Sequence, residues 1–591
     1  MGRFDTSNLS REDKKRVFFR LMKYVFQHKG LLFLAVVFSF LSNVFSLVCP
    51  YISGKAIGLI KLSEGVGSVD MKAMGSYAVL MLILYLLSAV FAYCLTITMV
   101  NLTRHIIRRL RNDVFNKLAI LPVGYFDVHQ TGDILSRMSY DIDVLNTSLS
   151  TDIVQVLSSV ITIVFAFSMM VAISPRLLIV FLFTIPLMIL LITVITKKTR
   201  PLFRRRSALL GTLNGFTEEM ISGQKTLRAY NREKIANEKF GVKNHEACEA
   251  YYQTDYHGTI VGPSVNFVNN LSLALVSMFG SLLFLSGGIG LDGLSSFILY
   301  SKKFSGPINE IANIIGDLQS ALSAGERIFR LLDEIPEPED LPEATDAENV
   351  RGQIDFENVD FSYVAGKPII EKLNLHVKAG SSVAVVGPTG AGKTTIINLL
   401  MRFYDPQSGR VCLDGRDLRG YKRKSLRSSY TMVLQDTWLF QGTIYENLAY
   451  GREDATREDV RRACEAAGIA PFVESLPNGY DTVLNDDATN ISKGQKQLLT
   501  IARAMLVHSE LLIFDEATSN VDTVTEHQIQ EAMNKLMAGK TSFIIAHRLS
   551  TVRHADVILV VFGGKIVEVG SHEELMAKNG VYAGMYQAQF I

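Results

Sequence analysis

The chain has 591 residues and a formal net charge of only +2, which argues against a general nucleic-acid-binding protein. Its length is too great for one ordinary hydrophobic core, so several domains are expected. A hydrophobic fraction of 48% and a mean hydropathy of +0.21 indicate membrane-spanning segments. The five cysteines lack the spacing of a metal site or a disulfide framework, so we expect them to be small apolar side chains in a reducing compartment.

Six stretches in the first half of the chain are predicted to cross a lipid bilayer, because spanning requires about 20 mostly apolar residues. They are residues 31–50, 78–102, 153–173, 177–195, 261–285 and roughly 291–315. The last is the weakest candidate, since it carries Lys302, Lys303 and Pro307. A polar, basic lead-in segment precedes the first stretch, whose length is not that of a signal peptide.

Two long segments, at about residues 103–152 and 196–260, separate these stretches and carry most of the basic clusters. The positive-inside rule therefore predicts that both long segments and both termini are cytoplasmic. Their helical periodicity predicts that they continue the spans as helices, with short polar turns at the far tips. A turn so far from the bilayer is suited to docking on another domain, although ordinary tips of helix hairpins are the alternative.

The composition changes after Leu332, where the acidic, proline-rich segment DEIPEPEDLPEATDAEN predicts a linker. From Ile354 onward, apolar strands alternate with helical segments, which is typical of an α/β domain. We therefore assign residues 1–330 to a six-helix transmembrane domain, 331–352 to the linker and 353–591 to an α/β nucleotide-binding domain.

The segment VAVVGPTGAGKTTIINLL matches the phosphate-loop pattern G-x-x-x-x-G-K-[ST] between an apolar strand and a helix. Its glycines let backbone N–H groups surround phosphate oxygens, and the helix N-terminus adds the positive end of its dipole. Lys393 is expected to reach the β- and γ-phosphates of ATP, and the Thr394 hydroxyl to bind Mg²⁺. The predicted ATP-binding residues of the loop are Gly387, Pro388, Thr389, Gly390, Ala391, Gly392, Lys393, Thr394 and Thr395.

The segment ELLIFDEATSNVD predicts a second strand of the ATP site. Asp515 is placed to bind Mg²⁺, and Glu516 follows it as the candidate general base that polarises the attacking water. Two acids that merely end a strand are the alternative for this pair alone. The phosphate loop upstream favours the catalytic interpretation.

These ordered motifs make the chain resemble an exporter half-transporter of the ATP-binding cassette (ABC) family, from about Arg20 to the C-terminus. The resemblance implies six spans fused to one P-loop cassette. It also implies that the two tip turns are coupling helices, one touching its own cassette and the other its partner's.

The resemblance assigns further roles in the cassette. Tyr363 would stack on adenine, Gln435 would sense the γ-phosphate and Mg²⁺, and His547 would contact the γ-phosphate. Asp522 would lie across the interface between two cassettes. In isolation, Tyr363 and His547 would be taken for a packed aromatic residue and a core histidine, and the order of the motifs favours the functional roles.

The segment NISKGQKQLLTIARAML holds the signature that this family places over ATP bound by the other cassette. The usual pattern is L-S-G-G-Q, and the matching residues here are Ser492, Lys493, Gly494 and Gln495 after an isoleucine. Ser492 and Gly494, which are expected to touch the γ-phosphate, are retained. Lys493 stands where glycine permits a close approach or a positive φ, so we expect added bulk and strain there.

The altered signature and the intact Glu516 and His547 belong to two different ATP sites of a dimer. A homodimer would carry the alteration twice, whereas a heterodimer would confine it to one site. The chain resembles the catalytic-glutamate subunit of bacterial heterodimeric multidrug-type exporters. We therefore hypothesise a partner half-transporter that has a consensus signature and lacks the glutamate. A homodimer that tolerates Lys493 is the alternative.

The resemblance implies ATP-driven export of small amphipathic substrates across a bacterial cell membrane by alternating access, with the bilayer as a partner and no nucleic acid. A lipid or lipopeptide flippase is an alternative, as is an ATP-gated channel or regulator. Asn266, Asn269 and Asn270 share helical spacing in the fifth span, where hydrogen bonding between helices is favoured over a substrate cavity. No cluster of charges within the spans indicates a substrate.

Overall fold

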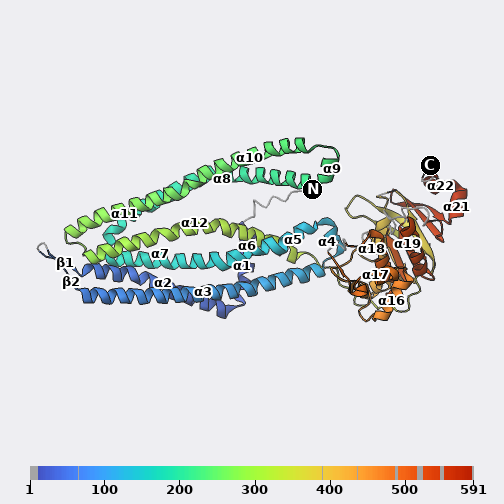
Figure 1. Ribbon diagram of the computed structural model, residues 1–591, viewed down its shortest axis with the longest axis horizontal. Helices are drawn as coiled ribbons and strands as arrows, with labels where there is room; N and C mark the ends of the chain where they lie inside the picture. The colour runs from blue at the N-terminus through green and yellow to red at the C-terminus, as the bar shows by residue number, and fades with distance from the viewer. Residues whose placement is uncertain are drawn as a thin grey trace. The chain divides into compact units, whose positions relative to one another are not determined.

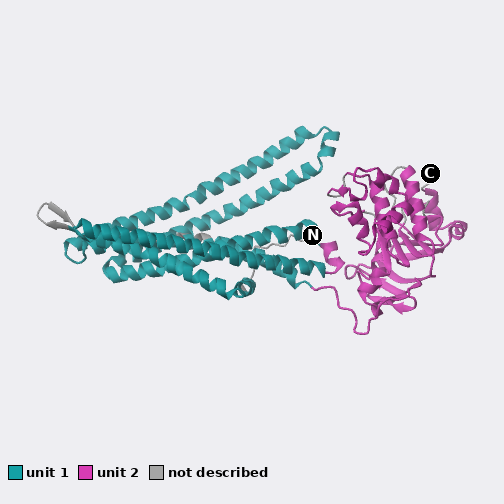
Figure 2. Cartoon of the chain, turned by 60° about the horizontal axis from the view of Figure 1, so that its bottom comes forward, with its two compact units in different colours: residues 1–120, 129–334 teal, residues 121–128, 335–591 magenta. Residues whose placement is uncertain are grey.

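The computed structural model describes residues 11–63, 66–388, 390–434, 437–485, 490–515, 523–545 and 552–588. The chain divides into two compact units (Figure 2). Unit 1 comprises residues 1–120 and 129–334 and is built of long helices. Unit 2 comprises residues 121–128 and 335–591 and combines β-sheets with shorter helices.

Unit 1 consists mainly of helices that run beside one another for much of their length (Figure 1). They are α1 (Arg11–Phe26), α2 (Lys29–Gly58), α3 (Met71–Ala119), α5 (Thr131–Ser136), α6 (Ile142–Thr147), α7 (Ile153–Ile173), α8 (Ile179–Ser222), α9 (Gln224–Ala229), α10 (Glu233–Thr259), α11 (Val261–Leu285) and α12 (Leu291–Asp333). A hairpin of β1 (Ile60–Ser63) and β2 (Val66–Val69) joins α2 to α3. The apolar runs of α3 and α8 continue into basic helical segments, which confirms that the long polar segments extend the spans as helices.

Five helical stretches of the described chain are long and apolar enough to cross a membrane. They are Lys29–Gly58, Met71–Ala119, Thr131–Ile173, Pro175–Ser222 and Glu233–Leu285. The prediction of six spans is therefore confirmed for five. The sixth stretch is helical as part of α12, but Lys302, Lys303 and Glu310 interrupt its apolar run.

Unit 2 contains a six-stranded sheet in the order β14–β13–β5–β12–β11–β8 and a four-stranded sheet in the order β4–β3–β6–β7. The strands are β3 (Ile354–Phe361), β4 (Ile370–Val377), β5 (Ser382–Val386), β6 (Ser408–Leu413), β7 (Arg416–Asp417), β8 (Tyr430–Val433), β11 (Leu511–Asp515), β12 (Thr541–Ile545), β13 (Val557–Phe562) and β14 (Lys565–Gly570). A short pair, β9 (Gly442–Thr443) and β10 (Val483–Leu484), lies apart from both sheets. The α/β class expected for this half of the chain is confirmed.

The helices of unit 2 are α4 (Val123–Val128), α13 (Lys393–Leu400), α14 (Arg423–Ser428), α15 (Ile444–Ala449), α16 (Arg457–Ala466), α17 (Ala470–Ser475), α18 (Lys493–Met505), α19 (Thr523–Met537), α21 (His572–Lys578) and α22 (Val581–Ala588). They cover strands made almost wholly of buried apolar residues, such as β5 and β11. Continuous apolar runs of this kind are expected of parallel strands that are buried on both faces.

Strands β8, β11, β12, β5 and β13 of the six-stranded sheet are parallel to one another, and the edge strand β14 is antiparallel to β13. Their carboxyl ends therefore lie at one edge of the sheet. Ile545 at the end of β12 pairs in register with Asp515 of β11 and with Val385 of β5. Ligands of open α/β sheets bind outside the carboxyl ends of the strands, so this edge positions the site.

Candidate ATP-binding site

The phosphate loop leaves β5 and enters α13 by a path that requires glycine at two positions. Gly387 has a φ of +155°, and a Cβ atom added to it would lie 2.1 Å from the Val561 carbonyl oxygen. Gly392 has a φ of +103° and directly precedes α13. Any other residue would be strained at Gly392 or would clash with β13 at Gly387. Thr389 lies outside the described residues.

Lys393 begins α13 with its side chain folded back into the loop. Its Nζ atom donates hydrogen bonds to the carbonyl oxygens of Gly387 at 2.8 Å and Pro388 at 3.1 Å. Only 7% of the residue is exposed, so the loop holds a positive charge on its inner side. Thr394 is exposed at the N-terminus of the helix, whereas Thr395 is buried.

Tyr363 lies beside α13. Its hydroxyl group is 3.3 Å from Thr395 Oγ1 and accepts a hydrogen bond of 2.9 Å from Asn398 Nδ2. The ring contacts Phe361 and Tyr404 edge to face, with centroids 4.9 and 5.0 Å away. Because 43% of Tyr363 remains exposed, its packing leaves surface for a planar ligand.

Asp515 ends β11 at the same sheet edge as the phosphate loop and is half-buried there. Three further predicted residues follow strands that end at this edge: Gln435 after β8, Glu516 after β11 and His547 after β12. These three residues, together with Asp522, lie outside the described residues. The topology thus brings the strands that precede the predicted catalytic residues to one edge.

The residues at this edge fit a Mg²⁺ ion that is bound together with a nucleotide. The Thr394 hydroxyl and the Asp515 carboxylate are oxygen donors, which Mg²⁺ prefers. In nucleotide sites Mg²⁺ keeps few protein ligands and takes the rest from phosphates and water. The described residues hold no group of three or more His, Cys, Asp or Glu side chains suited to a metal.

The signature residues form the N-terminus of α18. Ser492 caps the helix: its Oγ accepts from the Gln495 backbone N–H at 3.2 Å, and Gln495 Oε1 accepts from the Ser492 N–H at 2.9 Å. Lys493 is the exposed first residue of the helix and is not among the residues with a positive φ. The expected backbone strain at Lys493 is therefore wrong, because a helical first turn accepts any L-residue. What lysine adds is bulk and charge. Gly494 is buried.

Helix α4 comes from the long segment after α3 and packs within unit 2. Asp127 Oδ2 accepts a hydrogen bond of 2.5 Å from the Tyr404 hydroxyl, and a Cβ atom on Gly124 would lie 2.8 Å from the Tyr404 hydroxyl oxygen. Burial and this hydrogen bond raise the pKa of Tyr404 well above its usual range, so the phenol keeps its proton and donates it. The first tip turn therefore docks on the cassette of its own chain.

The second tip turn is α9, which joins α8 to α10 and has no buried residue.

Tyr404 was not predicted from the sequence, because no motif marks it. Its position shortly after the phosphate-loop helix was the only available indication. Through its ring, Tyr404 connects the α4 contact to Tyr363 at the predicted adenine site.

The chain matches the family described as "ABC transporter transmembrane region" over residues 32–308 and the family described as "ABC transporter" over residues 370–519. It is 40% identical over 579 residues to the Uncharacterized ABC transporter ATP-binding protein YfiC of Bacillus subtilis (strain 168), covering 98% of this chain and 95% of that relative. The chain belongs to the ABC transporter family. As an ABC exporter half-transporter, it hydrolyses ATP with Mg²⁺, couples hydrolysis to transport and acts as a dimer in a lipid bilayer.

Two other relatives of this ABC half-transporter have named substrates. It is 45% identical over 522 residues to the Fatty acid ABC transporter ATP-binding/permease protein of Mycobacterium bovis (strain ATCC BAA-935 / AF2122/97), covering 88% of this chain and 82% of the relative. It is 34% identical over 509 residues to the ATP-dependent lipid A-core flippase of Hahella chejuensis (strain KCTC 2396), covering 86% and 87%. A solved bacterial Atm1-family ABC exporter with ATP bound is similar with a TM-score of 0.78 and 28% identity, covering 95% of this chain and 98% of that one.

Two charged residues within α12 form hydrogen bonds with neighbouring helices of the ABC half-transporter. Lys303 Nζ donates to Ser46 Oγ at 2.8 Å, and Ser159 Oγ donates to Glu310 Oε2 at 3.0 Å. Neither charge has an opposite charge within ion-pair distance in the described part of the chain. The sequence contained these residues, but their serine partners on α2 and α7 could not be recognised without the tertiary structure.

The asparagines of α11 do not form the hydrogen bonds between helices that were predicted for them. Asn266 and Asn270 are exposed within unit 1, and Asn269 is half-buried. Across the described ranges, none of the three makes a side-chain hydrogen bond, and Asn269 Oδ1 is buried without a partner. Hydrogen bonding between helices of this chain is therefore not their role in the described structure.

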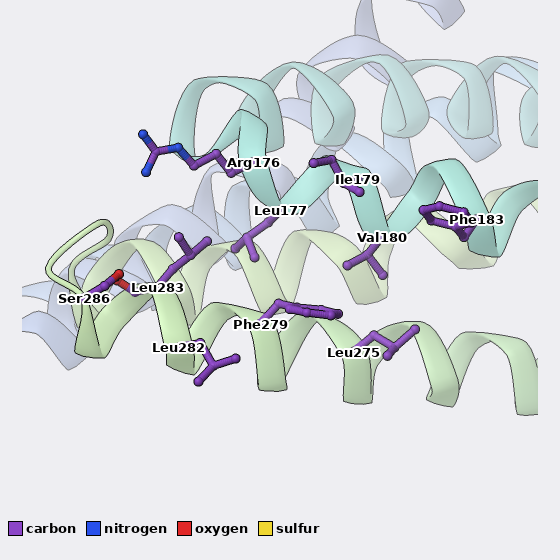
Figure 3. A pocket seen from close by; sticks show the side chains of 10 residues that line it. All are labelled: Arg176, Leu177, Ile179, Val180, Phe183, Leu275, Phe279, Leu282, Leu283 and Ser286. Carbon is purple, nitrogen blue, oxygen red and sulfur yellow. The ribbon is translucent and has the colours of Figure 1, made fainter.

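An apolar pocket of about 570 Å³ lies between the start of α8 and the end of α11. Figure 3 shows apolar side chains from both segments around it, among them Val180, Phe279 and Leu283. The Arg176 guanidinium at its rim points away from them. The pocket therefore offers apolar surface with no charge directed inward.

Proposed function

We propose that this ABC half-transporter exports small amphipathic substrates from the cytoplasm by alternating access. The packing of α4 within unit 2, through the hydrogen bond between Asp127 and Tyr404, carries this proposal. The chain enters α4 from α3 and leaves it toward α5 and α7, so a movement of the cassette that displaces α4 is passed directly to two spanning helices. Both termini and the basic segments are assigned to the cytoplasmic side.

In the proposed chemistry, the phosphate loop and Lys393 hold the phosphates of ATP, and Tyr363 stacks on adenine. Thr394, Gln435 and Asp515 hold Mg²⁺, which neutralises charge on the phosphates. Glu516 accepts the proton of the attacking water, while His547 contacts the γ-phosphate. Asp522 lies across the interface to the second cassette.

We assign this chain to a heterodimer in which it is the catalytic-glutamate subunit. The signature helix is well formed, yet Lys493 puts an exposed, bulky cation on the turn that would face ATP of the other cassette. The site built on this chain's own phosphate loop keeps its complete set of predicted residues. A homodimer would place Lys493 in both sites and is the alternative.

The test begins with a tagged chain purified from its own host membrane. Mass spectrometry should detect a second, different half-transporter in the complex, whereas recovery of this chain alone would support a homodimer. Inverted membrane vesicles should then accumulate a fluorescent amphiphile only with hydrolysable ATP. ATP hydrolysis without any accumulation would favour a channel or regulator.

A lipid flippase is a second candidate, favoured by the relatives named for fatty acid transport and for lipid A-core flipping. Proteoliposomes that contain a head-group-labelled lipid separate the two functions. A flippase exposes the label to a membrane-impermeant quencher on the far side in an ATP-dependent manner. An exporter of water-accessible amphiphiles instead concentrates its substrate in the vesicle interior.

A further inference from the structure

The acidic linker that follows α12 is held against the cassette by two arginines of α14. Arg427 binds Glu337 through both guanidinium Nη atoms: Nη1 donates to Oε2 at 3.1 Å and Nη2 donates to Oε1 at 2.5 Å. Arg423 donates from Nη1 to Asp340 Oδ1 at 3.0 Å and from its backbone N–H to Asp340 Oδ2 at 3.1 Å. Arginine–carboxylate pairs of this kind fix geometry as well as contributing energy. The linker is therefore fixed to the cassette at Glu337 and Asp340.

Only a short stretch of chain separates the end of α12 from these pairs. Helix α12 ends at Asp333, and residues 334–336 alone lie between it and Glu337. An extended chain spans only about 3.3–3.6 Å per residue. Pro336 also fixes its own φ and restricts the residue before it. A displacement of Glu337 is therefore passed to α12 with little slack.

The same two arginines hold residues 401–405, which directly follow the phosphate-loop helix α13. Arg427 Nη2 donates to the Arg402 carbonyl oxygen at 3.0 Å. Arg423 Nη2 donates to Asp405 Oδ2 at 3.4 Å. Two side chains of α14 thus join the acids of the linker to the end of α13.

Arg402 holds this segment in a backbone conformation that is unusual for a residue with a side chain. Its φ is +50°, in the left-handed region where the end of a helix commonly has glycine. The side chain is buried and donates from Nε to Asp405 Oδ1 at 3.2 Å and from Nη1 to the Tyr421 carbonyl oxygen at 2.9 Å. Such a conformation persists only where the surrounding contacts over-determine it. Residues 401–405 therefore form a rigid junction.

This junction also contacts α4 and the predicted nucleotide site. It contains Tyr404, whose hydroxyl donates to Asp127 of α4 and whose ring contacts Tyr363 edge to face. Two long helices of unit 1 are thus connected to residues 401–405: α3 through α4, and α12 through the linker. Nucleotide binding at α13 therefore acts on a segment to which both helices are connected.

We propose that Glu337 and Asp340 are positioning residues that couple movement of the cassette to α12, as a second connection beside α4. The inference rests on the proposed export function and adds a route from the nucleotide site to the transmembrane domain. Without the two acid–arginine pairs, the linker would be held mainly farther along, at Thr345, whose N–H donates to the Gly420 carbonyl oxygen at 3.0 Å. The longer free stretch would then absorb the movement.

Two fluorescent reporters distinguish this connection from the one through α4. The full complex, with its native cysteines replaced by serine, is purified into lipid nanodiscs. A bimane label is attached to Gln319→Cys on α12 or to Asn112→Cys on α3, both exposed positions. AMP-PNP with Mg²⁺ should change the fluorescence of both. Glu337→Gln combined with Asp340→Asn should lower the α12 response by about threefold or more and leave the α3 response unchanged.

The double substitution leaves Arg423 one further contact with the linker, to the Pro338 carbonyl oxygen at 2.7 Å, so an insertion provides a second test. Gly-Ser-Gly-Ser after Ile335 keeps both acid–arginine pairs but adds slack before them. It should also lower the α12 response by about threefold or more. The same insertion after Glu343, an exposed residue beyond both pairs, is the matched control and should leave the response unchanged.

A further control tests charge alone. Asp346→Asn removes an exposed pair of the same linker, with Lys422 Nζ at 2.8 Å, and should leave both responses unchanged. An unchanged α12 response in both the double substitution and the insertion after Ile335 would overturn the proposal. So would equal losses at α3 and α12, because a general defect of the cassette would then account for them.

The reporters and transport give distinguishable outcomes. An α12 response that depends on the linker, together with no ATP-driven uptake into inverted vesicles, would support the connection and overturn the export function. ATP-driven uptake, together with an α12 response that is insensitive to both changes, would overturn the connection and leave the export function standing.

Discussion

Glu516 is the residue on which hydrolysis is predicted to depend. Glutamine has nearly the same shape but cannot accept the proton of the attacking water, so Glu516→Gln should lower steady ATP turnover by about 10² or more. Phosphate release by the purified complex measures the effect. Glu510→Gln, a change of an exposed acid just before β11, is the matched control. Appreciable turnover in Glu516→Gln would contradict the assignment.

Lys493 is predicted to act on a ligand and not on the fold. Because its backbone is already helical, Lys493→Gly relieves no strain and should change the free energy of unfolding by about 1 kcal/mol or less. It should instead alter how long nucleotide is retained at the second site, measured by release of labelled ATP. Lys493→Ala removes the charge and keeps helix propensity, so it separates charge from backbone freedom. A large loss of stability would argue for a structural role.

For single residues, the sequence predicts a structural role where a short local motif determines it. The path of Gly387 and Gly392 follows from the phosphate-loop pattern, because the constraint lies within a few residues. Tyr404 could not be predicted in this way. Its importance depends on which side chains from distant segments lie near it, and no spacing along the chain records that.

Among the structural elements, α4 is predicted to transmit movement. Tyr404→Phe keeps the ring but removes the hydrogen bond to Asp127, a bond to a charged group, so transport should fall by about tenfold. ATP hydrolysis should fall less, and the ratio of transported substrate to hydrolysed ATP measures the difference. Asp127→Asn should have a similar effect, and the double variant should add little to either. Equal losses of transport and hydrolysis would indicate a structural defect instead.

The helices also show which features of the fold could be predicted from apolar periodicity in the sequence. Apolar length correctly predicted five helices that are long and apolar enough to span a membrane, together with their polar extensions, because hydropathy and helix period are local properties. The sequence alone did not show how α12 accommodates its charges, since Lys303 donates a hydrogen bond to a serine of α2 and Glu310 accepts one from a serine of α7. The capacity of a helix to bury charges depends on its neighbours, and these are defined only in the folded chain.

For the whole molecule, α9 is predicted to contact the cassette of the partner. Thr226→Cys puts a thiol on this exposed tip, in a background where the five native cysteines are replaced by serine. A short thiol–amine cross-linker should join it to a second, different half-transporter, identified by mass spectrometry. Gly241→Cys, about a third of the way along α10, is the matched control and should give less product. Cross-links confined to this chain's own cassette would contradict the prediction.

The cap of α18 has a consequence for how two cassettes meet. The Ser492 hydroxyl accepts the Gln495 N–H, and this contact leaves its own proton as the group that can be offered outward. The signature is therefore preset as a donor in the single subunit, with its rotamer fixed by the start of the helix. The Ser492 side chain therefore loses little orientational freedom when it binds a phosphate oxygen. The geometry that recognises ATP across the dimer is already formed when each subunit folds.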